Sequence, residues 1–347
     1  MLVSDIGEFQ LIELLTETLD QEAVLLPGEA DADGNRLRLA IGDDAAAWDS
    51  PAGTRVFTTD TMVEGGHFVL DQIGWHGLGW KAMVVNLSDI AAMGCLPTYS
   101  IVTLGLRDEL PVDGLVQMYR GIAEACHGFG GQVVGGDIVR SPVFFVTVAM
   151  EGATMAQDET GQGALLTRGA AKIGDLVAVT GTLGDSAGGF RIASAGTPFD
   201  NSTSRLRGAH FRPTPRLAVG QTLVNAGGKA AMDISDGLMG DLQKFCQASG
   251  VGAVVHADSV PVSDELIQKF PDDWLSLALT GGEDYELLFA ATEKVVEEAR
   301  QTTDVPVTII GKIVDSAEGV LVIDEAGSPI DVGHAGWDHF KNVKRQT

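Results

Sequence analysis

Acidic residues beside small residues recur along this chain where apolar segments give way to turns. The stretches are IGDD (41–44), TTDT (58–61), GGD (135–137), DISDGL (233–238) and GGED (281–284). Aspartate is short and holds its oxygens near the backbone, and small neighbours let a phosphate approach closely. Mg²⁺ prefers oxygen ligands and commonly shares them with the phosphates of a substrate. The pattern therefore predicts strand ends that gather several Mg²⁺ ions around a transferring phosphoryl group.

Each of these turns also has a structural explanation, because aspartate at such a junction often caps a helix or closes a turn. For DISDGL the two roles are compatible, so we expect the turn to cap the following helix while its carboxylates face a metal. Asp89 differs, because it lies in the segment 76–93, which is apolar almost all round and predicts a buried helix. An unpaired carboxylate is costly to bury there, which favours a ligand role.

The charge balance narrows the class of partner. Lys and Arg total 23 against 48 Asp and Glu, for a formal net charge of -25. A nucleic-acid groove needs a basic footprint, so the composition argues against nucleic acid. Divalent cations are the natural intermediaries for a phosphate on such a surface, although most of the acid is expected to be solvated surface that aids solubility.

Targeting features are expected to be absent. No run of 18 apolar residues occurs, and the first residues lack the pattern of a signal peptide, so we expect no membrane partner. The three cysteines, Cys95, Cys126 and Cys246, form no CxxC pair and predict reduced thiols in a cytoplasmic protein.

The chain length of 347 residues favours two domains. Strands and helices alternate in both halves, which predicts an α/β (α+β) fold. We expect helices at 4–19, at about 113–128 and from near 215, and a strand at 142–152. The polar stretch 155–163 is typical of a connector. The predicted domains are 1–152 and 153–347.

Other chemistries have less support. The chain contains no GxxxxGK[ST], GxGxxG or HExxH motif and no zinc-like Cys/His cluster, and GDSAGG is not a GxSxG elbow. His67 is a candidate substrate contact or a polar loop residue. Arg168 could clamp a phosphate or be solvated, and Trp337 could stack on a ligand or pack in the core.

The motifs taken together resemble those of thiamine-monophosphate kinases, which belong to the aminoimidazole ribonucleotide synthetase-like superfamily of ATP-using enzymes. The similarity extends from Gly7 to Phe340. The motifs that carry it, in chain order, are GDDAA, TTDTMVEGGHF, KAMVVNLSDIAAMG, GGD, TRGAAKIGD, TGTLGDSAGG, DISDGL and GGEDYEL. NLSDxAAMG and GGD are shared across the superfamily, whereas TDTxVxGxHF with SDGL and GGEDYEL points to the kinases.

This resemblance implies a fold and a reaction. The fold is a two-domain aminoimidazole ribonucleotide synthetase-like fold, in which N-terminal mixed sheets form a barrel across a homodimer and a C-terminal α/β domain follows. The reaction converts ATP and thiamine monophosphate to ADP and thiamine diphosphate, with ATP bound near the dimer interface. Direct in-line transfer is expected, since no side chain stands out as a covalent intermediate. Mg²⁺ is the expected metal, and a K⁺ requirement stays open.

The resemblance also assigns roles to individual residues. The implied Mg²⁺ ligands are Asp44, Thr58, Thr59, Asp60, Asp89, Asp137, Asp233 and Asp236. The implied nucleotide contacts are Gly136, Asp137, Arg168 and Ser235. The implied contacts to thiamine monophosphate are His67, Glu283 and Trp337. Asp60, Asp89, Asp137 and Arg168 are the expected catalytic residues. An acidic pocket with an aromatic wall suits the cationic thiazolium ring of that substrate.

Three alternatives stay open at the level of sequence. Another ATP-using enzyme of the same superfamily, similar to aminoimidazole ribonucleotide synthetase, is the nearest. A non-catalytic nucleotide or Mg²⁺ sensor is the second, although acid is retained in every one of the acidic turns. In the third, the acidic turns have only a structural role.

Overall fold

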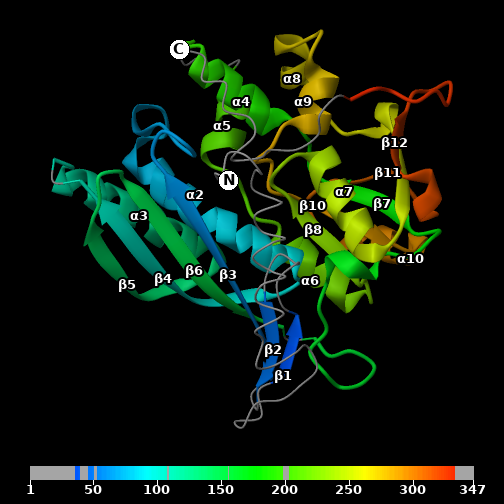
Figure 1. Cartoon of the computed structure of the whole chain (residues 1–347), viewed down its shortest axis with the longest axis horizontal. Helices are drawn as coiled ribbons and strands as arrows, with labels where there is room; N and C mark the ends of the chain where they lie inside the picture. The colour runs from blue at the N-terminus through cyan, green and yellow to red at the C-terminus, as the bar shows by residue number, and fades with distance from the viewer. Residues whose placement is uncertain are drawn as a thin grey trace, which may run out of the picture.

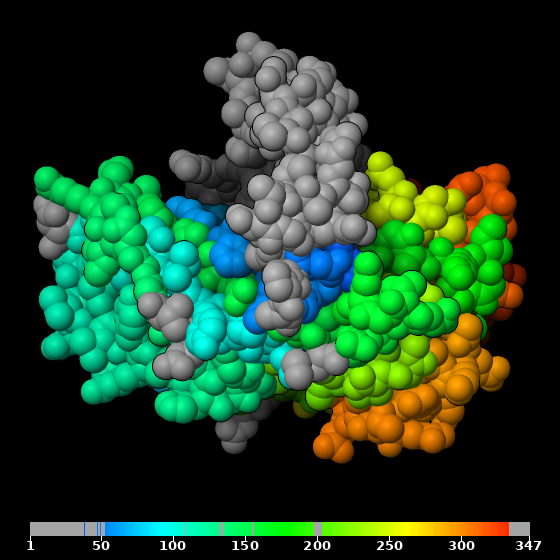
Figure 2. Space-filling model, turned by 90° about the horizontal axis from the view of Figure 1, so that it is seen from below, coloured from blue at the N-terminus to red at the C-terminus, as the bar shows by residue number. Residues whose placement is uncertain are grey.

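The computed structural model describes residues 36–39, 46–50, 53–107, 109–154, 156–197 and 203–332. The predicted helix at 4–19 and the candidate residues Asp44 and Trp337 lie outside these ranges. Within the described ranges, two six-stranded sheets and their helices form two halves, drawn as ribbons in Figure 1. Figure 2 shows these halves side by side, the N-terminal half in cyan and teal and the C-terminal half from green to orange. Among the described residues, no helix is long and apolar enough to cross a membrane.

The first sheet is mixed and has the strand order β1-β2-β3-β6-β4-β5. All its neighbouring strands are antiparallel except β4 and β5, which are parallel. The bounds of β1 to β6 are Arg36–Leu39, Ala46–Ser50, Gly53–Val63, Leu96–Leu106, Gln132–Arg140 and Phe145–Ala153. Alternate residues of β6 are buried, as expected when one face of a sheet packs on the core. The predicted domain boundary after residue 152 falls at the end of β6 and remains a prediction.

Two helices pack with this sheet. Helix α2 (Leu70–Ala92) contacts β3 and β6, and helix α3 (Val112–Phe129) packs along α2. The two helices approach closely at Gly79, where a Cβ atom would lie 1.9 Å from the carbonyl oxygen of Met118. Only glycine permits this approach. The structure confirms the predicted helices at 76–93 and at about 113–128, although α2 begins earlier than predicted.

The second sheet is also mixed, with the order β12-β9-β11-β7-β10-β8. Only β12 and β9 are parallel neighbours in it. Its central strands are buried over almost their whole length. The bounds of β7 to β12 are Leu176–Thr180, Ala230–Ile234, Gly252–His256, Glu286–Ala291, Val307–Val314 and Val320–Ile323.

Several shorter helices surround the second sheet. The predicted helix near residue 215 is confirmed as α6. The bounds of α4 to α10 are Asp185–Ser194, Ser204–Phe211, Leu217–Asn225, Leu238–Ser249, Asp264–Lys269, Trp274–Thr280 and Glu293–Thr302. The short 3₁₀ segments η1, η2 and η3 are Arg168–Ala170, Ala257–Ser259 and Ser316–Glu318.

Helix α2 belongs to the cores of both halves. On one side it contacts β3 and β6, and on the other it contacts α6, β8 and β10 (Figure 1). A single apolar cluster joins Ile90 of α2 to Val148 of the first sheet and to Phe289 of the second. Because packed interiors deform little, this shared helix fixes the positions of side chains from one sheet relative to those from the other.

Two of the acidic stretches lie inside strands, which corrects the expectation that they follow strand ends. Asp60 is within β3 and pairs with Val148 of β6. Asp137 is within β5 and pairs with Thr103 of β4. β-branched residues follow each aspartate, and these suit a pleated sheet, so the strand continues beyond the acid.

Candidate active site

Adjacent residues of α2 bind oxygens that come from both sheets. The Asp89 Oδ2 atom accepts a hydrogen bond from the Thr58 hydroxyl of β3 at 2.5 Å. The Ser88 hydroxyl donates to Asp233 Oδ2 of β8 at 2.7 Å. These contacts bring three predicted metal ligands, Thr58, Asp89 and Asp233, to the junction of the two halves.

The carboxylates at this junction repel one another. Burial and, after it, the charge of Asp236 raise the pKa of Asp60 to about 6. Burial also raises the pKa of Asp233 to about 6, against the lowering effects of the Ser88 hydrogen bond and the Arg168 charge. Asp60 and Asp236 add to the rise at Asp233. The charges of three predicted metal ligands, Asp60, Asp233 and Asp236, therefore repel one another, and a bound cation would stabilise them. We call these three residues the acidic cluster.

The DISDGL turn is held by a residue further along the chain. Helix α7 begins after Gly237, which has no side chain to cap it. Instead, Asp241 in the first turn of α7 accepts hydrogen bonds from the backbone N–H groups of Ser235 at 3.0 Å and Asp236 at 2.9 Å. The Lys244 amine donates to both Asp236 and Asp241. The expectation that this turn supplies a side-chain cap for α7 is therefore wrong, because the N-cap position is Gly237 and Asp241 binds N–H groups of residues that precede the helix.

The Gly-Gly-Glu-Asp turn packs against the DISDGL turn through its backbone. The Glu283 N–H group donates to the Ser235 carbonyl at 2.7 Å, and the Tyr285 N–H group donates to the Ile234 carbonyl at 2.9 Å. Glu283 and Tyr285 have positive φ angles of 66° and 52°, which are uncommon for residues other than glycine. Such conformations persist where surrounding contacts enforce them, often at functional sites.

The Glu283 carboxylate is surrounded by basic side chains. Its Oε1 atom lies 3.0 Å from the Lys81 amine, and its Oε2 atom lies 3.4 Å from His210 Nδ1. Burial would raise the pKa of Glu283, but the charges of Lys81, His210 and His67 together lower it. The His67 Nδ1 atom accepts a hydrogen bond from the Val63 N–H group at 3.2 Å. Two of the three predicted substrate contacts, His67 and Glu283, therefore interact electrostatically.

The burial of the His210 imidazole predicts that the stability of the folded chain depends on pH. Burial, followed by the charge of Lys81, lowers the pKa of His210 from 6.5 to about 4, and Glu283 opposes the change. Between these values the unfolded chain binds a proton that the folded chain does not. Above about pH 6.5 the buried imidazole therefore does not lower the free energy of unfolding. As the pH falls from 6.5 to about 4, protonation of the unfolded chain lowers the free energy of unfolding by about 3 kcal/mol.

The measurement is denaturant unfolding of the wild type and of His210→Gln between pH 7.5 and 4.5. We expect the free energy of unfolding to fall more steeply for the wild type. His256→Gln, at an exposed histidine, is the control and should follow the wild type. Parallel curves for the wild type and His210→Gln would contradict a buried neutral imidazole.

Tyr285 is a buried residue directly after the Gly-Gly-Glu-Asp turn, and its N–H group binds the Ile234 carbonyl of the DISDGL stretch. Its side chain is 7 % exposed. Burial, and then the charges of Glu283, Asp60, Asp233 and Asp236, raise the pKa of its hydroxyl well above the usual value. All four carboxylates therefore act on one buried phenol, and the backbone hydrogen bonds between the two turns join the predicted phosphate and substrate parts of the site.

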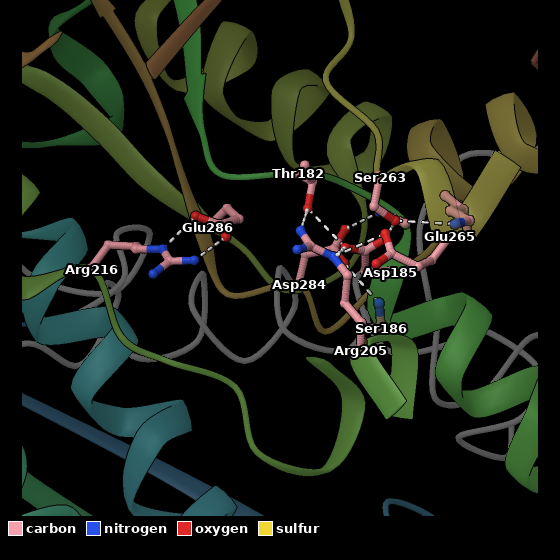
Figure 3. Close-up of polar contacts among 11 residues, drawn as sticks. Thr182, Asp185, Ser186, Arg205, Arg216, Ser263, Glu265, Asp284 and Glu286 are labelled. Carbon is pink, nitrogen blue, oxygen red and sulfur yellow. Dashed lines mark hydrogen bonds and ion pairs between the residues drawn. The ribbon is translucent and has the colours of Figure 1, made fainter. Parts of the chain in front are cut away.

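A separate polar network supports the Gly-Gly-Glu-Asp turn from the other side (Figure 3). Asp284 accepts hydrogen bonds from the N–H groups of Gly184 at 2.8 Å and Ser186 at 3.2 Å, which are the free donors at the start of α4. The Arg216 guanidinium binds both oxygens of Glu286, a residue of β10. Asp185 contacts Thr182, Arg205 and Ser263. These side chains engage one another, so we interpret the network as structural support for the turn.

Two predicted ligands lie on the other face of the first sheet. Residues paired directly across strands point to the same face, and successive residues alternate. Asp60 is in register with Val148, Val102 and Gly136. Asp137 is in the next row, which also contains Thr61, Thr147 and Thr103, and Thr59 shares this second face. The Thr59 hydroxyl donates a hydrogen bond to the Val148 carbonyl at 3.0 Å, and the Asp137 carboxylate accepts one from the N–H group of Ile138.

The predicted nucleotide contacts are divided between the region of the acidic cluster and strand β5. Arg168 begins η1, and its charge lowers the pKa of Asp233, so it is near the acidic cluster. Ser235 is in the DISDGL turn. Gly136 lies in β5, where a Cβ atom would meet the Val102 carbonyl oxygen at 1.9 Å, so this close strand pairing requires glycine.

No complete metal centre is preformed in the described ranges. Among these residues, no group of three or more His, Cys, Asp or Glu side chains is arranged to hold a metal ion. The acidic cluster supplies hard oxygen donors, and Mg²⁺ commonly completes its coordination with water and substrate phosphates. The donor chemistry thus fits Mg²⁺ bound together with a nucleotide.

Several residues of the site were not predicted as candidates. They are Lys81, Ser88, His210, Asp241 and Tyr285. A signal existed for Lys81, since a lysine at the start of an apolar helical stretch requires a partner when it is buried. No local pattern distinguished His210, because its contact with Glu283 depends on how α5 packs.

Comparisons with known proteins define the class. The model of the AIR synthase related protein, N-terminal domain, matches residues 42–154, and that of the C-terminal domain matches residues 172–324. The predicted two-domain α/β fold with mixed sheets is confirmed. The thiamine-monophosphate kinase of Aquifex aeolicus is 33% identical over 98% of this chain and 100% of its own length. The thiamine-monophosphate kinase of Escherichia coli K12 is 36% identical over 88% of this chain and 92% of its own length. The chain therefore belongs to the AIR synthase related proteins and, among them, to the thiamine-monophosphate kinase family.

Solved structures agree with this placement. AaThiL complexed with AMPPCP and TMP is 31% identical and superposes with a TM-score of 0.81, covering 98% of this chain and 99% of that chain. A thiamine-monophosphate kinase from Stenotrophomonas maltophilia K279a is 34% identical with a TM-score of 0.72, covering 91% and 96%. Relatives and structures of one activity therefore cover nearly all of the chain.

Proposed function

We propose that this chain phosphorylates thiamine monophosphate with ATP, giving thiamine diphosphate and ADP. The observation that carries the proposal is the packing of the Gly-Gly-Glu-Asp turn on the DISDGL turn, where the Glu283 N–H group donates to the Ser235 carbonyl at 2.7 Å and the Tyr285 N–H group donates to the Ile234 carbonyl at 2.9 Å. A phosphoryl-transfer site and a contact for a cationic ring would then belong to one continuous site. The similar protein AaThiL, solved with AMPPCP and TMP, supports ATP and thiamine monophosphate as the two substrates.

In the proposed reaction, a phosphate oxygen of thiamine monophosphate attacks the terminal phosphoryl group of ATP in line, and ADP leaves. The attacking phosphate is ionised at neutral pH, so no strong general base is required. Arg168, whose charge lowers the pKa of Asp233, is a cationic side chain that would bind phosphate oxygens. Catalysis then consists mainly of positioning and charge stabilisation.

Mg²⁺ is the proposed metal because the donors available at the site are hard oxygens. Asp60, Asp89, Asp233 and Asp236, with Thr58, are the described residues that would hold it, and Asp44 is proposed from the sequence alone. Gly136, in the row of Asp60, is a proposed nucleotide contact, and Thr59 and Asp137, which the resemblance implies as further Mg²⁺ ligands, lie on the other face of the sheet. When bound, Mg²⁺ neutralises charge on the phosphates. We include no K⁺ ion in the proposal.

The test is an assay with purified protein, ATP, Mg²⁺ and thiamine monophosphate, in which thiamine diphosphate is followed by chromatography with an EDTA control. Metal-dependent formation of thiamine diphosphate is the expected result. ADP released with another acceptor would favour a different AIR synthase related reaction. Nucleotide binding without any product would favour a sensor.

We further propose a homodimer in which the first sheets of two chains join into a barrel. Apolar side chains stay exposed on the face of this sheet opposite α2, including Phe57 at 39 %, Tyr99 at 54 % and Ile101 at 45 %. Exposed apolar patches of this kind often mark interaction surfaces. The edge strand β5 has backbone groups that a second copy could pair.

Ile101→Asp is therefore expected to shift the mass measured by light scattering from dimer to monomer, because it buries a charge in the proposed interface. Ile267→Asp is the matched control, since Ile267 is 38 % exposed on α8 in the other half. An unchanged mass for Ile101→Asp, or a monomeric wild type, would contradict this interface.

We also propose a cytoplasmic location. The three cysteines are all free thiols, as the sequence predicts, and two of them are buried. Burial raises the pKa of Cys95 to about 12 and that of Cys246 to about 11, so neither is a reactive thiolate. Free thiols are typical of reducing compartments, and cell fractionation with an antibody to the chain would test the location.

A further inference from the structure

Lys81 is a fully buried cation outside the predicted site. Its side chain is 1 % exposed and belongs to α2, within the core shared by the two halves. Burying an ammonium group is costly unless it is paired and hydrogen-bonded. The partner of Lys81 is Glu283 Oε1, at 3.0 Å. The buried Lys81 ammonium group thus contacts Glu283, a residue predicted to bind the substrate.

Glu283 is fixed from its inner side and accessible from its outer side. Lys81 and His210 contact its two oxygens, and its N–H group binds the Ser235 carbonyl. In spite of these contacts, the Glu283 side chain is 34 % exposed. The carboxylate therefore has little rotational freedom while part of it remains open to a ligand.

The same helix connects Lys81 to the phosphate end of the site. Lys81 precedes Ser88 and Asp89 by two turns of α2, a rise of about 12 Å at 1.5 Å per residue. Ser88 binds Asp233, and Asp89 binds Thr58. One buried helix therefore sets the spacing between Glu283 and the residues proposed to bind metal and phosphate.

We propose that Lys81 is a positioning residue that orients Glu283 toward the organic part of the substrate, at a distance from the phosphate site set by α2. The inference rests on the proposed function, in which Glu283 contacts thiamine monophosphate. It assigns to α2 a role in substrate selection: a phosphorylated cation of the right length reaches both ends of the site. Lys81 itself does not touch the substrate.

The first experiment compares steady-state kinetics of the wild type and Lys81→Met. We expect KM for thiamine monophosphate to rise at least about tenfold, as on loss of one partner of a buried ion pair, with kcat and KM for ATP changed less than about threefold. Lys81→Arg keeps the charge and should restore part of the affinity. Lys172→Met, at an exposed lysine, is the matched control and should match the wild type. A fall in kcat with unchanged KM for thiamine monophosphate would overturn the positioning role.

A double-mutant cycle with Glu283→Gln separates positioning from a general loss of structure. If Lys81 acts through Glu283, adding Lys81→Met to Glu283→Gln changes the affinity for thiamine monophosphate, measured by calorimetry, less than about twofold. The double variant leaves no unpaired buried charge, so it remains informative if Lys81→Met alone does not fold. A further tenfold loss in the double variant would overturn the inference.

Failure of the positioning role and failure of the proposed function give different results. If Glu283→Gln weakens binding of thiamine monophosphate and Lys81→Met does not, the positioning role is wrong and the proposed function stands. If the wild type does not bind thiamine monophosphate at all, the proposed function is wrong and the inference falls with it.

Discussion

Asp60→Asn is expected to lower kcat by a factor of about 100 to 1,000, comparable to the loss of one preorganised electrostatic contact in a transfer reaction. Asp60 belongs to the acidic cluster, where its charge adds to those of Asp233 and Asp236. The substitution keeps the shape and removes one proposed metal-binding charge. Asp89→Asn should behave in the same way, because its Oδ2 atom accepts from Thr58 at the same junction.

The Asp60→Asn variant should be no less stable than the wild type when metal is absent. Burial raises the pKa of Asp60 from 3.8 to about 6, so its ionisation opposes folding as the pH rises through that range, and the penalty remains at pH 7. Removing the charge should therefore raise the metal-free stability by an amount on the order of 1 kcal/mol. Lower activity combined with equal or higher stability would distinguish a ligand from a structural residue.

The measurements are kcat at saturating substrates, the Mg²⁺ concentration that gives half-maximal rate, and thermal unfolding with EDTA. Asp272→Asn is the matched control, because it removes the same charge from an exposed turn. An active Asp60→Asn enzyme with unchanged Mg²⁺ dependence would remove Asp60 from the site.

Arg216→Met is expected to lower the free energy of unfolding by about 3–5 kcal/mol, the usual result of leaving one member of a buried ion pair without its partner. The Glu286 side chain is 5 % exposed and that of Arg216 is 19 % exposed. Glu286 accepts two hydrogen bonds from the guanidinium and one from Thr180. Without Arg216, a carboxylate would stay buried in β10 beside the Gly-Gly-Glu-Asp turn (Figure 3).

Denaturant unfolding would measure this loss. The double variant Arg216→Met/Glu286→Leu should recover most of the stability, because apolar replacements of a buried pair are often neutral or better. Arg191→Met is the control, since the Arg191–Asp273 pair is about half exposed and should contribute less than about 1 kcal/mol. If Arg216→Met costs no more than Arg191→Met, the buried pair does not stabilise the turn.

The sequence was informative about features that depend on neighbours in the chain. The segment 76–93 is apolar almost all round, and this predicted a buried helix that the structure confirms in α2. The order of the acidic motifs was enough for the resemblance to thiamine-monophosphate kinases. Residue type and local spacing suffice here, because a helix or turn presents its side chains according to a fixed local geometry.

Strand limits and sheet faces were harder to predict. Asp60 and Asp137 were expected at strand ends, but both lie inside strands whose hydrogen bonds continue past them. A shift of one residue moves a side chain to the opposite face of a sheet. The separation of Asp60 from Asp137 could therefore be decided only by the register of β3, β6, β4 and β5.

Local sequence determined the chemical character of this site, and the tertiary structure decided its composition. Acid beside glycine predicted a phosphate-handling surface from residue types alone. The contact of Ser88 with Asp233 spans 145 residues, and those that Glu283 makes with Lys81 and His210 also join distant segments. Such contacts form only when α2 packs between two sheets, because the core that fixes their geometry is assembled from residues of both halves.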